Sequence, residues 1–363
     1  MSLRVSLVRM PLLSAFSNSG GTMLSRNALI LELAEGGTQA FSECVTEETP
    51  SCTGEDNGTA LRAIKTEFAR ELRADPPSPE RFLDSVERVE GHQMAKAAVE
   101  MLLWDYHAKR NGVPLDEALG ESRGYAEAGV AIGLGRDSEV VGRVEAALKR
   151  GYKRIKVKID RAGASKTLGA IREAFPEIPL SADANACFEL PRDMARLKRM
   201  DEFGLQYLEQ PLGYDDLAGH ARLAKEMSTP ICLDESVTTV ERATQALEIG
   251  AAKVINVKPG RVGGLTPAME IARITRARRA HVWVGGMLET GVGRAFNVAL
   301  ASQRQFDYPG DTSPNDRYFE RDLVKNPFKM RRGRVRPNPG KGSGIELDRD
   351  YLASVTLGSW KLF

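Results

Sequence analysis

The sequence lacks the features that mark membrane-spanning, secreted and nucleic-acid-binding proteins. No apolar run among its 363 residues approaches the roughly 20 residues needed to cross a bilayer, and no signal-peptide pattern opens the chain. The formal net charge is only +2, so the chain has no general attraction for polyanions. These absences predict a cytoplasmic protein without a nucleic-acid or membrane partner.

Cysteine and histidine are also scarce, with four of each. Cys44, Cys52, Cys187 and Cys232 form no CxxC pair and lie far apart, which favours free buried thiols over disulfides or a zinc site. The histidines match no metal-binding or catalytic-triad spacing. Zinc chemistry and histidine-based nucleophilic catalysis are therefore not predicted.

The first third of the chain reads as a small α+β domain. Residues 3–11 and 27–44 have the composition of strands, and helical periodicity follows, most clearly over residues 93–109. Residues 14–26 and 46–58 are rich in small and polar residues, which predicts two mobile loops.

Ionisable residues then recur at a nearly constant spacing. From Lys158 the steps are 25 residues to Asp183, 26 to Glu209, 25 to Asp234 and 24 to Lys258. Each of these residues ends a short apolar run, and a strand, a helix and two turns occupy about that length. The period predicts repeated βα units with one ionisable group at each strand end, where barrel enzymes have their active sites.

The predicted fold class is therefore α/β. It is a (β/α)8-type barrel, or modified TIM barrel, with an N-terminal α+β capping domain that the C-terminal tail completes. Within the barrel we predict a first strand at 129–133 and a short eighth strand at 308–311, and in the tail a possible strand at 345–347. The predicted boundaries are 1–124 for the cap, 125–312 for the barrel and 313–363 for the segment that packs back on the cap.

Two lysines share one side of the second barrel strand. Alternation along the strand points Lys156 and Lys158 the same way and Val157 the other. A parallel barrel strand has no solvent face, so two inward lysines are costly unless anions face them. The alternative is a half-exposed strand whose lysines are solvated.

Asp183, Glu209 and Asp234 end three consecutive predicted strands and would converge at one end of the barrel. An all-oxygen ligand set without histidine or cysteine suits a hard divalent cation, Mg2+ or possible Mn2+, rather than zinc. Any one of these acids alone could be a helix cap. Three in register favour a metal site.

Lys258 follows on the next predicted strand and would face Lys158 across the acids. A neutral lysine is a base, although the neutral form at pH 7 costs roughly 4.6 kcal/mol at an unperturbed pKa near 10.4. Nearby Lys156 and a divalent cation would both lower that cost. Such lysines beside a metal suit removal of a proton α to a carboxylate, with the resulting charge stabilised by the ion.

Longer motifs carry a resemblance to a known family. On these motifs, which span most of the chain in order, the sequence resembles the muconate-lactonizing subgroup of the enolase superfamily. Within that subgroup it resembles the o-succinylbenzoate synthase and N-succinylamino acid racemase family. The motifs are Gly91-His-Gln-Met-Ala-Lys96, Ile155-Lys-Val-Lys-Ile159, Asp183-Ala-Asn185, Glu209-Gln-Pro-Leu212, Cys232-Leu-Asp-Glu-Ser236, Asn256-Val-Lys-Pro-Gly-Arg-Val-Gly-Gly264, Gly285-Gly-Met-Leu-Glu-Thr-Gly291 and Pro309-Gly-Asp-Thr-Ser313.

The resemblance implies a role for each residue of the constellation. Lys158 and Lys258 become the two acid/base residues, and Lys156 becomes the companion that lowers the pKa of Lys158. The implied Mg2+ ligands are Asp183, Glu209 and Asp234. The implied substrate-binding or tuning residues are Arg261, Asn185, Gly286 and Met287.

The resemblance also implies two reactions on a small-molecule carboxylate. One is the syn dehydration of an o-succinylbenzoate synthase in menaquinone biosynthesis, and the other is racemisation of an N-succinylamino acid. A dipeptide epimerase or a muconate cycloisomerase-like enzyme is the alternative, and a homo-oligomer is expected. Ala131 and Val284 depart from the residues common in the family and would line the pocket.

A hypothesis of another class rests on the basic run 329–336. Such a run is usually a solvated loop, but it would also serve a catalytically idle barrel that binds an acidic partner or RNA. Retention of all five site residues argues against an idle barrel.

Overall fold

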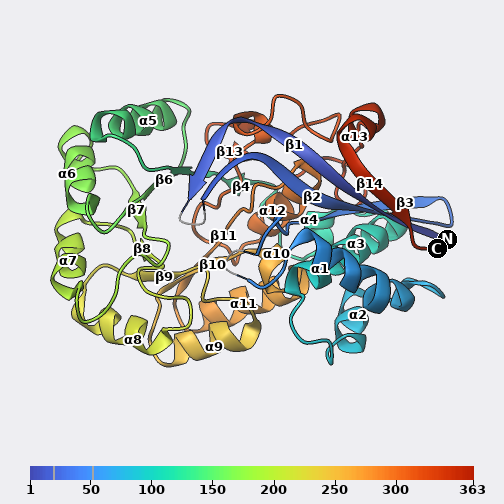
Figure 1. Ribbon diagram of the computed structural model, residues 1–363, viewed down its shortest axis with the longest axis horizontal. Coiled ribbons are helices and arrows are strands. Elements are labelled where there is room, and N and C mark those ends of the chain that lie inside the picture. Colours follow the sequence, from blue (N-terminus) through green and yellow to red (C-terminus); the bar gives the residue numbers. More distant parts are fainter. Residues whose placement is uncertain (19–20, 51–52) are drawn as a thin grey trace.

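The computed structural model describes residues 1–18, 21–50 and 53–363. A four-stranded antiparallel sheet in the order β14-β1-β2-β3 forms the core of the cap. The two chain ends lie together at this sheet, where the amide of Leu362 donates to the carbonyl of Leu3 at 2.8 Å (Figure 1). The strands are β1 (Ser2–Asn18), β2 (Gly21–Glu35), β3 (Thr38–Cys44) and β14 (Thr356–Lys361).

The predicted loop at 14–26 is wrong for its described part, which continues the hairpin of β1 and β2. After a register shift between Pro11 and Phe16, the two strands pair again from Phe16 with Met23 to Asn18 with Gly21. Pairing satisfies the backbone regardless of side-chain polarity, so composition alone misread this segment. Residues 19–20 and 51–52, which belong to the two predicted loops, lie outside the described residues.

Helices cover one face of the cap sheet. The long helix α3 buries residues such as Ala98 and Leu102 in one cluster with Leu29 and Leu31 of β2. It ends at Gly112, whose φ of +74° favours glycine. The helices of this domain are α1 (Asn57–Ala63), extended by a π turn (Ile64–Phe68) and a 3-10 turn (Ala69–Leu72), α2 (Pro79–Ser85), α3 (Gln93–Asn111) and α4 (Leu115–Ala118).

Seven parallel strands form the barrel sheet in the order β11-β10-β9-β8-β7-β6-β5, with helices outside them (Figure 1). The strands are β5 (Gly129–Ile132), β6 (Arg154–Lys158), β7 (Leu180–Asp183), β8 (Leu208–Glu209), β9 (Ile231–Leu233), β10 (Val254–Val257) and β11 (His281–Val284). The helices are α5 (Asp137–Lys149), α6 (Ala164–Ala174), α7 (Met194–Lys198) with a 3-10 turn (Arg199–Phe203), α8 (Leu217–Glu226), α9 (Val240–Glu248), α10 (Pro259–Val262), α11 (Leu265–Ala277) and α12 (Gly291–Ala301).

Residues 307–311 close the barrel where an eighth strand was predicted. On one side the amide of Asp311 donates to Val284 of β11 at 2.8 Å, and on the other Gly129 of β5 donates to Gly310 at 2.7 Å. This segment forms one isolated β-bridge, between Ala128 and Gly310, rather than the short strand that was predicted. The barrel with its α+β cap confirms the predicted fold class.

The tail differs from its prediction in its strands. Residues 345–347 form only an isolated bridge between Leu347 and Val324, whereas β14, which pairs with β1, is longer than the two short tail strands β12 (Met330–Arg331) and β13 (Arg334–Val335). Strand β14 was missed because its partner lies at the opposite end of the chain. The remaining elements are β4 (Ala126–Glu127), a 3-10 turn (Asn315–Arg317) and α13 (Arg349–Val355).

Two general predictions can be compared with the described residues. None of the helices in residues 1–18, 21–50 and 53–363 is both long and apolar enough to cross a bilayer. Cys44 and Cys232 are buried free thiols and Cys187 is a half-buried one, whereas Cys52 lies outside the described residues.

Two buried acids of the cap bind the amino ends of barrel helices. Glu100 of α3 accepts from the amides of Leu265 and Thr266 at 2.9 and 2.7 Å, where α11 begins. Glu43 of β3 accepts in the same way from Thr290 and Gly293 at the start of α12. The first amides of a helix have no partner within it, so these carboxylates satisfy them. Burial raises the pKa of each acid to about 7.

Glu100→Gln should flatten part of the pH dependence of folding. Burial raises the pKa of Glu100 from 4.5 to about 7, so the folded protein keeps a proton that the unfolded chain releases. Its contribution to stability is fully present below pH 4.5 and is lost as the pH rises to about 7, an effect of roughly 3 kcal/mol. Between pH 4.5 and pH 8, the free energy of unfolding measured with denaturant should fall less in the variant than in the wild type. The exposed variant Glu121→Gln is the control and should fall as the wild type does. A fall in Glu100→Gln equal to that of the wild type would contradict the raised pKa of Glu100.

Candidate active site

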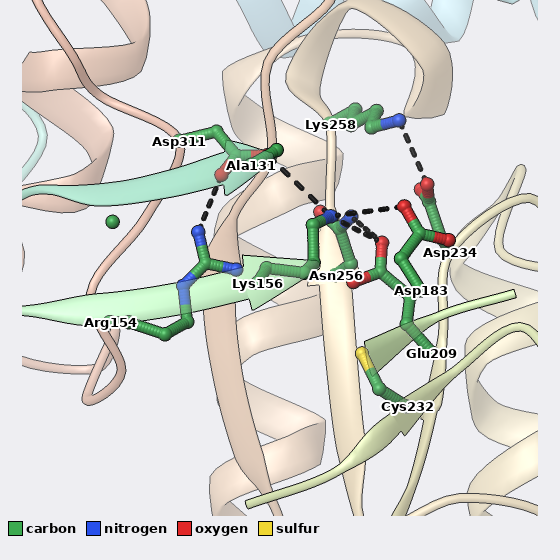
Figure 2. Close-up of polar contacts among 12 residues, drawn as sticks. Ala131, Arg154, Lys156, Asp183, Glu209, Cys232, Asp234, Asn256, Lys258 and Asp311 are labelled. Carbon is green, nitrogen blue, oxygen red and sulfur yellow. Dashed lines mark hydrogen bonds and ion pairs between the residues drawn. The ribbon is translucent and has the colours of Figure 1, made fainter. Parts of the chain in front are cut away.

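The structure brings the five spaced ionisable residues together at one end of the barrel. Lys158, Asp183 and Glu209 are the last residues of β6, β7 and β8, and they are neighbours in the strand register. Asp234 and Lys258 come one residue after β9 and β10. Figure 2 shows Asp183, Glu209 and Asp234 side by side, with Lys258 above them.

A chain of ion pairs connects these side chains. The ammonium nitrogen of Lys156 lies 2.9 Å from Glu209 Oε1 and 3.5 Å from Asp183 Oδ2. Lys158 Nζ lies 3.2 Å from the same Asp183 oxygen, and Lys258 Nζ lies 2.9 Å from Asp234 Oδ2. Every carboxylate therefore has at least one cation beside it.

Burial separates the inner lysine from the two outer ones. The side chain of Lys156 is 4% exposed, so the alternative of a strand with solvated lysines is wrong for this residue. The side chains of Lys158 and Lys258 are 12% and 17% exposed. The outer pair can therefore meet a substrate, while Lys156 is covered by its neighbours.

The local charges shift the pKa values of these residues in opposite directions. Burial, aided by the neighbouring Asp183 and Asp234, raises the pKa of Glu209 to about 8 despite Lys156. Burial would raise the pKa of Asp234 as well, but Arg261 and Lys258 outweigh it and hold that pKa well below its usual value. Burial opposes the charge of Lys258, yet Asp234 outweighs it and raises the lysine pKa. A role as base requires a cation to draw Asp234 away from Lys258.

The contacts of the three carboxylates show how well they suit a metal ion. Within the described chain, no three Asp, Glu, His or Cys side chains already converge as a metal-binding group. The donor set nevertheless fits, because Asp183 and Asp234 lie close enough to Glu209 for their charges to help raise its pKa. Glu209 Oε2 is also buried without a hydrogen-bond partner. Three hard oxygen donors, one of them unsatisfied, suit Mg2+ or Mn2+.

Arg154 and Asp311 belong to this network and were missed from the sequence. Arg154 Nη2 lies 2.5 Å from Asp311 Oδ1, and Asp311 Oδ2 lies 3.8 Å from Lys156 (Figure 2). The buried guanidinium also stacks 4.3 Å from the centre of the Trp283 ring. Strand alternation could have found Arg154, since it lies two residues before Lys156, but its partner comes from the distant barrel-closing segment.

Asn256 and Glu235 were also missed. Asn256 Nδ2 donates to Glu209 Oε1 at 3.0 Å, and its position two residues before Lys258 is the sequence signal for an inward side chain. Glu235 follows Asp234 directly, and burial together with Asp234 raises its pKa. With Asp311, the site therefore contains two further carboxylates beside the three predicted ligands.

Two glycines make room for the long cations. A Cβ on Gly285 would come within 2.8 Å of Lys258 Cγ and 2.9 Å of its Cε, so the lysine stem occupies that space. A Cβ on Gly129 would lie 2.3 Å from the guanidinium of Arg154. Glycine at these positions is a packing requirement of the site.

The four predicted tuning residues lie at different depths. Asn185 accepts from Lys158 Nζ and donates to Glu235 Oε1 at 3.0 Å, so it lies within the constellation. Arg261 is 1% exposed and its Nη2 donates to Asp234 Oδ1 at 2.5 Å. It would therefore act on a substrate through Asp234 rather than by contact.

Gly286 and Met287 lie in the segment after β11. Both are half-buried, and the amide of Met287 donates to Glu289 Oε1 at 2.7 Å. Ala131 is half-buried and appears beside Asp311 in Figure 2. Val284 is 1% exposed and belongs to the core, so the expectation that it lines the pocket is wrong. Its strand alternation with the inward Trp283 and Gly285 explains this placement.

Comparison with known proteins agrees with this architecture. Lysines beside acids that suit Mg2+ form the kind of site that enolase-superfamily enzymes use. The family model described as "Enolase C-terminal domain-like" matches residues 139–351, and "Mandelate racemase / muconate lactonizing enzyme, N-terminal domain" matches residues 2–120. The chain belongs to the mandelate racemase and muconate lactonizing enzyme family of the enolase superfamily.

Individual relatives match over nearly the whole chain. An o-succinylbenzoate synthase of Bacillus subtilis is 41% identical over 94% of this chain and 93% of its own length. An N-succinylamino acid racemase of Thermus thermophilus is 41% identical over 97% of this chain and 95% of its own length. A crystal structure of an enolase-superfamily member from Listeria innocua superposes with a TM-score of 0.96 at 35% identity, over 99% of this chain and 98% of that structure. The resemblance predicted from the motifs is confirmed.

A more distant relative carries the name of an epimerase, one of the two alternative enzyme classes. An L-Ala-D/L-Glu epimerase of Bacillus subtilis is 31% identical over 59% of this chain and 60% of its own length.

Asp234→Asn should weaken binding of Mg2+ by tenfold or more, because a neutral amide is a poorer ligand than a carboxylate. Isothermal titration calorimetry on both proteins would measure it, with circular dichroism to check folding. The exposed variant Glu121→Gln should bind as the wild type does. Unchanged affinity in Asp234→Asn would remove this residue from the metal site.

Proposed function

We propose that this chain removes the proton α to the carboxylate of a small substrate, with Lys158 and Lys258 as its acid/base residues. The observation that carries the proposal is the near-symmetry of the two lysines. Each is partly exposed, and each lies about 3 Å from an acid, at 3.2 Å for Asp183 and 2.9 Å for Asp234. A substrate above these acids would have one ammonium group on either side.

Asp183, Glu209 and Asp234 are the proposed ligands of Mg2+, or of Mn2+. When bound, the cation would stabilise the negative charge that develops on the substrate carboxylate as the α proton leaves. It would also compensate Asp234, which now favours the charged form of Lys258. Lys156, fixed by Glu209 and Asp183, would keep a positive charge beside Lys158 and so favour its neutral form.

We propose dehydration of the o-succinylbenzoate synthase type as one activity. Lys158 takes the α proton, and the same ammonium group then gives a proton to the hydroxyl that leaves as water from the same face. Lys258 stays protonated and stabilises the anionic intermediate by its charge. The names of relatives that match more than nine-tenths of the chain support this assignment.

Racemisation of an N-succinylamino acid is the second activity proposed for the same residues. One lysine takes the α proton from one face, and the other lysine delivers a proton to the opposite face, which inverts the carbon. The equal identity to a named synthase and a named racemase supports retaining both reactions. A homo-oligomer in the cytoplasm is part of the proposal, and light scattering would measure the oligomeric state.

The alternatives of a dipeptide epimerase or a muconate cycloisomerase-like enzyme have less support. Epimerases of the resembled subgroup carry an Asp-x-Asp on the eighth strand, whereas here Asp311 has Pro309 two positions earlier. Asp311 is also engaged by Arg154 and Lys156. Assays with a dipeptide and with muconate beside the two proposed substrates would compare these activities through kcat/KM.

Lys158→Ala should reduce dehydration of the cyclohexadiene precursor of o-succinylbenzoate by at least 1000-fold, because the base is removed. Exchange of the α hydrogen of an N-succinylamino acid in D2O, followed by proton NMR, should fall equally. Lys166→Ala, an exposed lysine of the same barrel end, is the control and should keep wild-type turnover. Wild-type turnover in Lys158→Ala would show that the base has been misassigned.

Lys258→Arg should separate the two reactions. The guanidinium keeps the positive charge but is a very poor proton donor and acceptor, so racemisation should fall by at least 1000-fold while dehydration falls far less. Polarimetry and ultraviolet absorbance would follow the two rates on one preparation. Equal losses in both would mean that Lys258 has the same role in each reaction.

A further inference from the structure

A hollow of about 1030 Å³ lies away from the candidate active site, beside the three-stranded sheet of β12, β13 and β4. Residues 325–339 form most of its lining, together with Tyr125 and Lys153. We call it the basic hollow. Lys153 comes directly before β6, whereas Lys158 ends that strand. The basic hollow therefore lies at the amino end of the barrel strands, opposite the proposed catalytic lysines.

Positive charge is concentrated in this hollow, whereas the chain as a whole is close to neutral. Seven cations line it, although the net charge of the protein is only +2. The segment 325–344 contains no aspartate or glutamate at all. The lining cations are Lys153, Lys325, Lys329, Arg331, Arg332, Arg334 and Arg336.

Most of these cations have no acidic partner. Arg334 lies 3.5 Å from Glu127, and Lys325 pairs with Glu346. The other five form no ion pair with any residue in the described ranges 1–18, 21–50 and 53–363. Like charges gathered on one surface repel one another, so a bound anion would lower the electrostatic energy.

The backbone that carries these side chains is held in place. Arg332 and Gly333 form the turn between β12 and β13, with φ values of +52° and +74°. Gly333 packs closely on Gly151, since a Cβ added to Gly333 would lie 2.2 Å from the carbonyl oxygen of Gly151. The carbonyl of Gly333 also accepts a hydrogen bond from the amide of Ala128 at 2.9 Å. Val335 is fully buried beneath. In Figure 1, β13 lies beside β4, against the barrel. The guanidinium groups therefore project from a fixed sheet.

The chemistry of the lining favours phosphate groups. Arginine forks bind phosphate oxygens through paired hydrogen bonds, and three arginines here, Arg331, Arg332 and Arg336, lack acidic partners. Asn338 contributes a buried Nδ2 donor without a hydrogen-bond partner. Several linked phosphates are needed to engage several cations at once, and a concave hollow suits a compact ligand better than an extended strand.

We propose that the basic hollow binds a small molecule carrying a chain of phosphate groups. The site is separate from the proposed active site, so the ligand would bind without displacing substrate.

Calorimetric titration of inorganic triphosphate into the Mg2+-loaded protein would test the proposal, with both solutions at equal Mg2+ and about 50 mM salt. The expected result is saturable binding that weakens as salt rises. Arg331→Ala with Arg336→Ala should weaken binding by at least tenfold, because two cations without acidic partners are removed. The matched control, Arg192→Ala with Lys198→Ala, removes two cations elsewhere and should bind as the wild type does.

Three outcomes would overturn the proposal. One is wild-type affinity for triphosphate in the double arginine variant, once circular dichroism has shown that this variant is folded. The second is absence of saturable binding to the wild type. The third is tight binding of a single-stranded RNA of 20 nucleotides that triphosphate does not displace, which would identify an extended nucleic-acid surface instead. Lys158→Ala should bind triphosphate normally, so this test is independent of the proposed catalytic function.

Discussion

Compensation of charge inside the barrel is the constraint on which the site depends. Lys156 lies almost without exposure between Glu209 and Asp183, and each of these groups would be costly to bury alone. Loss of one partner in such a network leaves an uncompensated charge behind and costs several kcal/mol. The acids and lysines are therefore interdependent, and the ion pair of Arg154 with Asp311 extends the same balance to the segment that closes the barrel.

The same constraint connects the site to the cap. The segment after β11 begins at Gly285, over which the stem of Lys258 passes, and ends at Thr290, whose amide is held by Glu43 of the cap. Only four residues thus lie between Gly285, on which a proposed catalytic lysine packs, and Thr290, which binds a buried carboxylate of the other domain. Glu43 and Glu100 each bind the start of a barrel helix, so the two domains meet through acids on helix termini as well as through apolar contacts.

The sequence predicted what short-range patterns determine. The constant spacing from Lys158 to Lys258 reflects one βα unit per step, and the carboxyl ends of parallel strands necessarily share one end of a barrel. The spacing could not reveal partners that meet only after folding. Arg154 and Asp311 are 157 residues apart, and β14 pairs with β1 across almost the whole chain. The pairing of residues 16–18 with residues 21–23 was missed because backbone pairing there does not depend on the polar side chains.

The arrangement of charge also explains why one site would serve two reactions. Dehydration and racemisation begin with the same loss of an α proton, so the acids and the cation they are proposed to hold face the same demand in both. The reactions diverge only in where the next proton goes. Lys158 and Lys258 are similarly exposed and lie at similar distances from their acids, so the protein itself gives neither face a clear advantage. The position of a leaving hydroxyl on the substrate would then decide the outcome, because a proton delivered there ends the reaction before the opposite lysine can act.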